Sequence, residues 1–366
     1  MTRLITTLFI LIAFSAPAIA GEELTLSEFM SATGVREGQI AMRDRPGWTA
    51  TPTIFVRHRA GITDDLEAMI PAATIIPVTG ATDAATHGVS ADIILGTCNA
   101  DLVNATDTLV WVQVFSAGVD RCMDVEALGN GDVLLTNMQK MSSPAIGEHA
   151  VAMMLSLARG LPRFAKAMPD GAWRRDLAQE PGMVTVTGKT VLVLGLGGIG
   201  SEVAKRANAL GMRVTATRNS SREGPPYVDY VGLSDEMAEL AAKADFVVNA
   251  LPLTAATKGL LDQAFFAQLK PGSYFVNVGR GGTVDTAALF DALEAGRLAG
   301  AGLDVTDPEP LPAEHPLWQM PNVIITPHIS STGSDRDLHR TLLRENLRRY
   351  VAGEALLNVV DPELGY

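Results

Sequence analysis

Three side chains suited to catalysis, Arg280, Glu309 and His328, follow one another in the second half of a chain of 366 residues. Each comes shortly after an apolar run that we predict to be a strand. In an open α/β sheet the carboxyl ends of the strands form the ligand-binding edge, so these side chains are expected to converge there. An arginine fork matches a carboxylate, and a histidine beside an acid is suited to proton transfer. Each residue alone is more often structural, and only their joint presence in this order favours catalysis.

A glycine-rich turn lies between a predicted strand, residues 190–194, and a predicted helix, residues 199–210. Residues 195–200 read G-L-G-G-I-G, which is the pattern G-x-G-x-x-G in the context that a dinucleotide site requires. Gly195 allows the tight turn, Gly197 lets a pyrophosphate approach the backbone, and Gly200 lets the helix pack against the strand. Gly198 and Ile199 are also predicted to bind the cofactor, because the N-terminus of the helix that begins at Ile199 faces the phosphates.

The residues after the next predicted strand, 213–217, bear on which dinucleotide is bound. An acidic residue normally stands there and binds the ribose 2′-hydroxyl, but this chain has Arg218, with Ser220 and Arg222 close behind. A carboxylate would repel a 2′-phosphate, whereas a guanidinium binds one bidentately. We therefore expect NADP to be preferred, with NAD as the alternative if Arg218 only lies along the adenine.

Short β-branched runs alternate with helical stretches along most of the chain, which indicates an α/β fold with doubly wound parallel sheets. A polar segment at 169–188 separates two such series, so we expect two α/β domains. A last helix at 333–350 carries an arginine run that we interpret as a solvated face. The predicted strands are 53–56, 73–76, 92–95, 109–115, 190–194, 213–217, 245–250, 273–278, 300–305 and 322–326, with a long helix at 143–161.

The composition excludes several classes of protein. With 47% hydrophobic residues the chain has material for a large core, which excludes disorder. Its net charge of −12 argues against nucleic acid as the main partner, because phosphate binding needs clustered cations. Two cysteines, Cys98 and Cys122, are too few for a disulfide scaffold or a cysteine zinc site, and we expect two isolated thiols unless an oxidising compartment pairs them.

Residues 1–20 have the pattern of a secretory signal peptide. Arg3 precedes a short apolar run, and a small-x-small triplet ends at Ala20. The sequence therefore predicts export to the periplasm if this leader is used and a cytoplasmic protein otherwise. No later segment is long and apolar enough to predict a membrane span.

Taken together, the motifs resemble the D-isomer-specific 2-hydroxyacid dehydrogenase family over roughly residues 52–355. The resemblance rests on the glycine loop and on ordered segments at 115–120, 146–151, 251–257, 277–285, 302–310 and 326–330. It implies a Rossmann NAD(P)-binding domain at 146–329, inserted into a flavodoxin-like substrate-binding domain formed by 21–145 and 330–366. It also implies a homodimer with the helix around 145–160 in the interface.

The resemblance further implies the role of each site residue. Arg280 would bind the substrate carboxylate and polarise its keto oxygen, His328 would be the acid–base, and Glu309 would hold the imidazole in its protonated form. Backbone N–H groups of Ala117 and Gly118 would grip the carboxylate from the other domain. No metal is expected, since Arg280 does the polarising. Further cofactor contacts would come from Pro252, Val278, Gly279, Asp304, Ser330 and Ser331.

The resulting prediction is an oxidoreductase that transfers a hydride between NAD(P)H and a small 2-keto acid, giving a D-2-hydroxy acid. A glyoxylate/hydroxypyruvate reductase and a short phosphoglycerate dehydrogenase-like enzyme remain alternatives within the family. A non-catalytic dinucleotide sensor on the same fold is the alternative from another class, because a fold alone does not specify activity.

Overall fold

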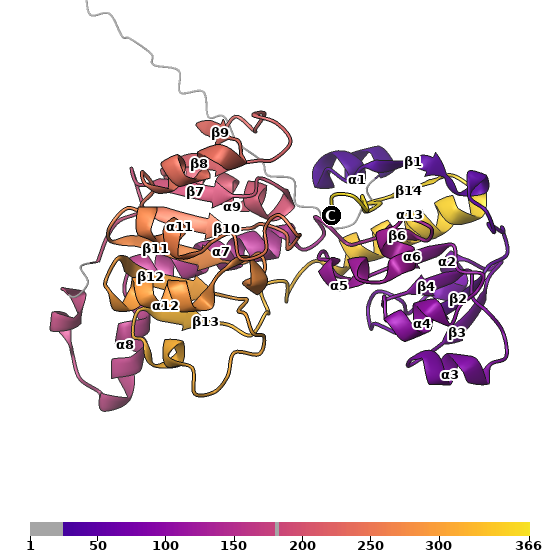
Figure 1. Cartoon of the computed structure of the whole chain (residues 1–366), viewed down its shortest axis with the longest axis horizontal. Helices are drawn as coiled ribbons and strands as arrows, with labels where there is room; N and C mark the ends of the chain where they lie inside the picture. The colour runs from indigo at the N-terminus through magenta and orange to yellow at the C-terminus, as the bar shows by residue number, and fades with distance from the viewer. Residues whose placement is uncertain (1–24, 180–182) are drawn as a thin grey trace, which may run out of the picture.

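A computed structural model describes residues 25–179 and 183–366, so the predicted signal peptide lies outside the described residues. Two parallel sheets, each with its own helices, form two bodies that lie side by side (Figure 1). Within the two described ranges every helix is too short or too polar to cross a bilayer.

The larger sheet is a seven-stranded doubly wound sheet in the order β13-β12-β11-β10-β7-β8-β9. Chain order runs outward in both directions from the β7–β10 pair, so the direction of winding reverses between these two strands. A ligand site is expected at the carboxyl ends of the strands at such a switch point. The strands are β7 (Thr190–Leu194), β8 (Arg213–Thr217), β9 (Tyr230–Gly232), β10 (Phe246–Asn249), β11 (Ser273–Asn277), β12 (Leu298–Leu303) and β13 (Val323–Ile325).

Both faces of this sheet are buried, as a parallel sheet requires. Along β7, Val191 and Val193 pack into one core, and Leu192 and Leu194 pack into the core on the opposite face. The first core also contains side chains of α7 (Ser143–Ala158) and α9 (Gly198–Ala209), and the second contains those of α10 (Met237–Ala241), α11 (Gln263–Gln268) and α12 (Thr286–Glu294). This two-sided burial explains why the strands read as continuous apolar runs.

The smaller sheet has five parallel strands in the order β3-β2-β4-β5-β6, which is the flavodoxin-like order. Its strands are β2 (Thr53–Val56), β3 (Thr74–Pro77), β4 (Ile93–Leu95), β5 (Trp111–Gln113) and β6 (Leu134–Thr136). The accompanying short helices are α2 (Leu66–Met69), α3 (Ala81–Thr86), α4 (Ala100–Asn104), α5 (Asp120–Met123) and α6 (Glu126–Gly129). The predicted fold class, two doubly wound parallel sheets, is confirmed.

Both ends of the described chain belong to the smaller sheet's body. The last helix, α13 (Arg336–Ala352), contributes Leu342, Leu347 and Tyr350 to the same core as Ile54, although it follows the seven-stranded sheet in sequence (Figure 1). β14 (Ala355–Leu357) then pairs antiparallel with β1 (Glu37–Ala41), which follows α1 (Leu26–Thr33).

Two helical expectations differ from the structure. The predicted helix 143–161 is two helices: α7 ends at Ala158, and Leu161-Pro162 begin α8 (Leu161–Ala167) instead of ending α7. Proline is favoured in the first turn of a helix, and Gly160 in the left-handed region makes the break. The arginine run of α13 is not all solvated, because Arg349 is buried and bonds Glu345, Glu37 and the Ala355 carbonyl.

Candidate active site

The glycine loop has the geometry that a dinucleotide needs. Gly195 lies in the left-handed region with φ 87°, and a Cβ on Gly200 would lie 2.0 Å from the Gly195 carbonyl oxygen. These two glycines are therefore required by the chain itself. A Cβ on Gly197 would meet no described atom within 4 Å, and no side chain caps the N-terminus of α9, which begins there. This open helix N-terminus fits the pyrophosphate of NAD(P).

The cations after β8 have different surroundings. Arg218 donates from Nη1 to the Glu223 carbonyl oxygen at 3.1 Å and is half-buried. Arg222 is held by a salt bridge to Glu236 and a hydrogen bond to the Tyr230 hydroxyl, and this pairing with Glu236 raises the pKa of Arg222. Arg218, rather than Arg222, thus keeps guanidinium donors for a 2′-phosphate. Ser220 is exposed beside them.

Arg280 follows β11 and points from the larger sheet's body into the smaller one's. Its Nε donates to Asp120 Oδ1 at 3.0 Å, and its Nη1 donates to the Gly279 carbonyl oxygen at 2.8 Å. A Cβ on Gly118 would lie 1.3 Å from Arg280 Nη2, so only glycine at 118 leaves room for this guanidinium. Arg280 is therefore fixed at the boundary between the two bodies.

The loop opposite Arg280 leaves its amide groups available. Ser116 Oγ donates to the Gly118 carbonyl oxygen at 2.8 Å, and Asn137 Nδ2 donates to the Ala117 carbonyl oxygen at 2.8 Å. In contrast, the backbone N–H groups of Ala117 and Gly118 donate to no acceptor in the described part of the chain. Two free amides beside a guanidinium form a binding surface for a carboxylate.

His328 and Glu309 form a direct pair. His328 Nδ1 lies 2.7 Å from Glu309 Oε1, and both side chains are about two-fifths exposed. The residues come from the loops after β13 and β12, which are neighbours in the sheet. Because Nδ1 faces Glu309, Nε2 is the nitrogen left to exchange a proton with a ligand.

Buried Asp304 holds the histidine loop in place. Its carboxylate accepts hydrogen bonds from the Thr326 hydroxyl at 2.6 Å, from Ile329 N at 2.9 Å and from Ser330 N at 3.0 Å. Burial alone would raise the pKa of Asp304, but the hydrogen bonds from Ser330 and Thr326 outweigh it and keep the pKa below its usual value. These bonds hold His328 at φ 54°, a left-handed conformation that costs a non-glycine residue about 1 kcal/mol.

The other residues that are predicted to contact the cofactor also lie at the edge formed by the carboxyl ends of the seven-stranded sheet. Gly279 N donates to the Asn277 side chain at 3.1 Å, and a Cβ on Gly279 would meet the Leu251 backbone next to Pro252. Val278 and Ser330 are buried, whereas Ser331 is exposed. A direct nicotinamide contact by Asp304, whose oxygens already accept these hydrogen bonds, stays a prediction.

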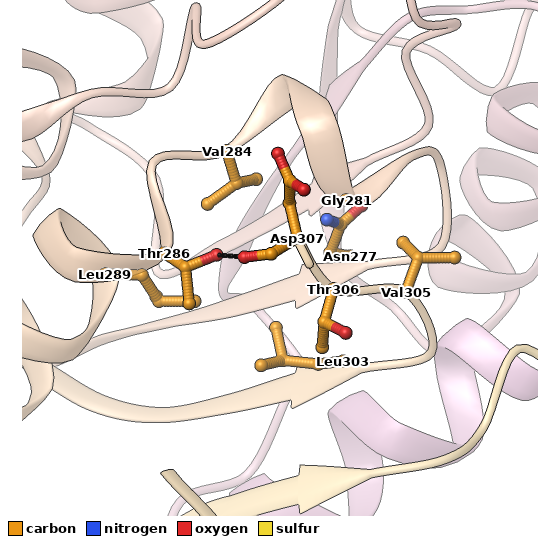
Figure 2. A pocket seen from close by; sticks show the side chains of 9 residues that line it. All are labelled: Asn277, Gly281, Val284, Thr286, Leu289, Leu303, Val305, Thr306 and Asp307. Carbon is orange, nitrogen blue, oxygen red and sulfur yellow. Dashed lines mark hydrogen bonds between the residues drawn. The ribbon is translucent and has the colours of Figure 1, made fainter. Parts of the chain in front are cut away.

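A small cavity lies among the loops and strands near this edge. Figure 2 shows its lining, in which Thr286 Oγ1 donates to the Asp307 carbonyl oxygen at 2.6 Å. Its lining includes Gly281, which follows Arg280, and Asp307, but none of Arg280, Glu309 and His328. No cluster of three or more His, Cys, Asp or Glu side chains in residues 25–179 and 183–366 is placed to hold a metal.

Comparison with known proteins places this geometry in a family. Residues 151–330 match the NAD binding domain of D-isomer specific 2-hydroxyacid dehydrogenases. The chain is 33% identical over 280 residues to glyoxylate/hydroxypyruvate reductase B of Citrobacter koseri, covering 75% of this chain and 86% of the relative. This chain belongs to the D-isomer-specific 2-hydroxyacid dehydrogenase family.

Two further comparisons set the scope of that assignment. A crystal structure of a family member from Xanthobacter autotrophicus in complex with NADPH and MES is 30% identical, with a TM-score of 0.73, covering 86% of this chain and all of that one. D-3-phosphoglycerate dehydrogenase of Methanocaldococcus jannaschii is 33% identical over 269 residues, 71% of this chain. The chain spans about half the length of that relative. The cofactor of the family fold is NAD or NADP.

Three features of this dehydrogenase-family site were not predicted. Asp120, which bonds Arg280, belongs to the 115–120 segment but carried no predicted role. His149 of α7 was given no role in the predicted site, yet its Nε2 lies 3.0 Å from Thr326 Oγ1 and 3.7 Å from Asp304 Oδ1. Lys140, before α7, reaches the glycine loop. Asp120 is an acidic residue close to Gly118, and His149 is a histidine on the helix between the two bodies. Both features could have marked these residues as site candidates.

The expectation of two isolated thiols was wrong, because Cys98 and Cys122 form a disulfide. β4 and β5 are adjacent parallel strands, so the segments that follow their carboxyl ends meet, and the two Cα atoms lie 5.4 Å apart. The bond ties the loop after β4 to α5, the helix that begins at Asp120. The spacing of the two cysteines in the sequence does not reveal how close they lie in the fold.

Proposed function

We propose that this protein is an NAD(P)H-dependent reductase that converts small 2-keto acids into D-2-hydroxy acids. The single observation that carries the proposal is the His328–Glu309 pair, whose loops follow β13 and β12 at the same sheet edge as Arg280 after β11 and the open glycine loop after β7. An acid–base pair, a carboxylate-binding fork and a dinucleotide site together are what reduction of a keto acid needs. We further propose the division into a substrate-binding domain, 21–145 with 330–366, and a nucleotide-binding domain, 146–329.

The mechanism assigns a role to each residue of the site. Arg280, oriented by Asp120 at its Nε, binds the substrate carboxylate and polarises the keto oxygen. The free N–H groups of Ala117 and Gly118 hold that carboxylate from the opposite side of the cleft. When bound, NAD(P)H supplies the hydride. His328 gives the proton from Nε2 to the carbonyl oxygen, and Glu309 at Nδ1 stabilises the imidazolium before that transfer.

The substrate is proposed to be small. The loops that face the cleft near Gly96 and Ser116 consist of small residues, and glyoxylate and hydroxypyruvate are therefore the first candidates. The Citrobacter koseri relative carries that pair of substrates in its name. A phosphoglycerate dehydrogenase-like activity is the second candidate within the family.

The test is an absorbance assay at the nicotinamide band with protein lacking residues 1–20. NADPH and NADH oxidation would be followed with glyoxylate, hydroxypyruvate, pyruvate, phenylpyruvate and phosphohydroxypyruvate. We expect turnover with at least one of the small keto acids and a D-hydroxy product. Nucleotide binding with no turnover on any of them would contradict the proposal and favour a dinucleotide sensor.

Arg218 is proposed to set a preference for NADPH. Replacing Arg218 by aspartate restores the acid that binds a ribose 2′-hydroxyl and repels a 2′-phosphate. We expect kcat/KM for NADPH to fall about 100-fold and that for NADH to change less than about threefold, since a charge-assisted phosphate contact contributes roughly 2–3 kcal/mol. Arg222→Gln is the matched control, because Arg222 is already paired with Glu236. An equal loss with both nucleotides would contradict this assignment.

A homodimer is proposed from the family resemblance and from one exposed surface. The segment from α8 to residue 179 projects away from the seven-stranded sheet (Figure 1). Its apolar side chains Leu161, Met168 and Trp173 are 53%, 75% and 92% exposed. Large apolar side chains that are exposed on one projecting segment are typical of a protein–protein interface. The α7 helix at its base is the proposed edge of that interface.

Export is proposed from the leader pattern together with the Cys98–Cys122 disulfide, because structural disulfides persist in oxidising compartments.

Reduction of the disulfide, or the double substitution Cys98→Ser/Cys122→Ser, should lower the free energy of unfolding of the substrate-binding domain by about 3 kcal/mol, as expected for a loop of this length. Thermal unfolding with and without reductant measures the effect. Two free thiols in denatured, unreduced protein isolated from the periplasm would refute the disulfide.

A further inference from the structure

Lys140 lies over the glycine loop although it belongs to the other body of the molecule. It stands in the connection between β6 and α7. A Cβ built on Gly198, the first residue of α9, would lie 3.1 Å from Lys140 Cγ and 2.6 Å from Ser143 Oγ. The stem of Lys140 therefore runs directly past the N-terminus of α9, where the amide groups are free of any side-chain cap.

The ammonium group of Lys140 has a replaceable partner. Its Nζ donates to the carbonyl oxygen of Gly34, which ends α1. That acceptor is a neutral carbonyl on the surface of the protein, and no described carboxylate forms an ion pair with Lys140. A hydrogen bond to a neutral carbonyl is weaker than one to an anion, so a phosphate within reach would compete for this donor.

Two further cations lie close to Lys140. Burial lowers the pKa of Lys140, and the like charges of Arg36 and Arg218 lower it further. None of the ion pairs in the described ranges involves any of these three residues. The three positive charges come from three separate segments: the link between α1 and β1, the connection between β6 and α7, and the loop after β8. Such a concentration of uncompensated charge beside an open helix N-terminus attracts an anion.

We propose that Lys140 binds the pyrophosphate of the dinucleotide, and so contributes a charged cofactor contact from the substrate-binding domain. This inference rests on the proposed nucleotide-dependent function. On binding, Lys140 Nζ exchanges the Gly34 carbonyl for a pyrophosphate oxygen at the N-terminus of α9. Lysine suits this role because it acts as a point charge on phosphate without demanding bidentate geometry.

This assignment separates two kinds of cation at the nucleotide site. Pyrophosphate is common to NADH and NADPH, so loss of Lys140 weakens both nucleotides equally. Arg218 stands where only the 2′-phosphate of NADPH is reached, so its loss changes the ratio between them. Lys140 thus sets affinity and couples nucleotide binding to the position of the substrate-binding domain, whereas Arg218 sets selectivity.

The test measures binding rather than turnover. Titration of the full mature chain with NADPH and with NADH, followed by nicotinamide fluorescence, gives both dissociation constants. For Lys140→Met we expect both to rise about tenfold with an unchanged ratio, and for Lys140→Arg we expect both to stay within about threefold of wild type. Lys243→Met is the matched control, since Lys243 pairs with Glu239 and both of these side chains are largely exposed.

Each alternative gives a different result. If Lys140 only caps α1, Lys140→Met lowers the melting temperature and leaves both dissociation constants unchanged, which overturns the proposal. A loss confined to NADPH assigns Lys140 to the 2′-phosphate and overturns the pyrophosphate assignment. Because binding is the readout, the comparison is decisive whether or not any keto acid is turned over. A wild-type protein that turns over no keto acid while Lys140→Met binds both nucleotides about tenfold more weakly supports Lys140 and refutes the reductase.

Discussion

Replacing His328 by asparagine should lower kcat by about 10³-fold with the best keto acid, because the reaction then lacks its proton donor. Asparagine is chosen because it tolerates the left-handed backbone conformation at position 328, where φ is 54°. The loss therefore reports the missing imidazole and not added backbone strain. Steady-state rates at saturating nucleotide and keto acid measure it, with thermal unfolding as the check that the loop held by Asp304 remains folded.

The partner substitution Glu309→Gln separates orientation from charge. Glutamine can still accept a hydrogen bond from His328 Nδ1, but it does not stabilise the imidazolium as a carboxylate does. We expect a smaller loss than in His328→Asn, and little further loss when both residues are replaced, since residues that act as a unit are not additive. A double variant whose losses multiply would show that the two side chains act independently.

The placement of Arg280, Glu309 and His328 at one edge could be predicted because a parallel sheet converts sequence order into spatial order. Arg280, Glu309 and His328 follow β11, β12 and β13, three neighbouring strands whose carboxyl ends lie at one edge. The glycine loop was predictable for a similar reason, since strand, turn and helix are contiguous in the chain. The fold class followed from continuous apolar runs that are buried on both faces of each sheet.

Contacts between segments that lie far apart in the chain could not be predicted from the sequence. The Asp120–Arg280 hydrogen bond joins residues 160 positions apart, and it depends on how the two bodies meet. The Cys98–Cys122 disulfide depends on β4 lying next to β5, which no local pattern encodes. The short strands β1, β6, β9 and β14 also escaped prediction, because they contain only three to five residues and pair at sheet edges or with one another.

Local signals misled where tertiary packing decided the outcome. The arginines of α13 fit a solvated face by composition, but Arg349 faces Glu37 and Glu345 and is only 6% exposed. A buried arginine persists only when its charge and donors are satisfied, and here two carboxylates and the Ala355 carbonyl do so. His149 was likewise not among the predicted site residues, because its partners Thr326 and Asp304 come much later in the chain.

Replacing Arg280 by glutamine should give the largest loss of kcat/KM in this protein. The residue is proposed both to hold the substrate carboxylate and to polarise the keto oxygen, so two effects combine. Loss of a preorganised donor to the developing oxyanion lowers kcat by about 10²–10³-fold. Loss of the charge-assisted carboxylate contact raises KM by at least about tenfold. Steady-state kinetics over a wide keto acid range measures the two separately.

Arg280→Lys is the informative companion to Arg280→Gln. Lysine keeps the positive charge, but its single ammonium group lacks the planar fork of a guanidinium. It therefore cannot donate to Asp120 and at the same time bind a carboxylate with two parallel hydrogen bonds. We therefore expect KM to rise nearly as much as in Arg280→Gln, while kcat recovers in part through the retained charge. Unchanged KM in both variants would mean that Ala117 and Gly118 hold the carboxylate without Arg280. An effect on KM reports the contact of Arg280 with the carboxylate, and an effect on kcat reports its contact with the keto oxygen. Measuring both constants therefore decides whether Arg280 acts on one of these groups or on both.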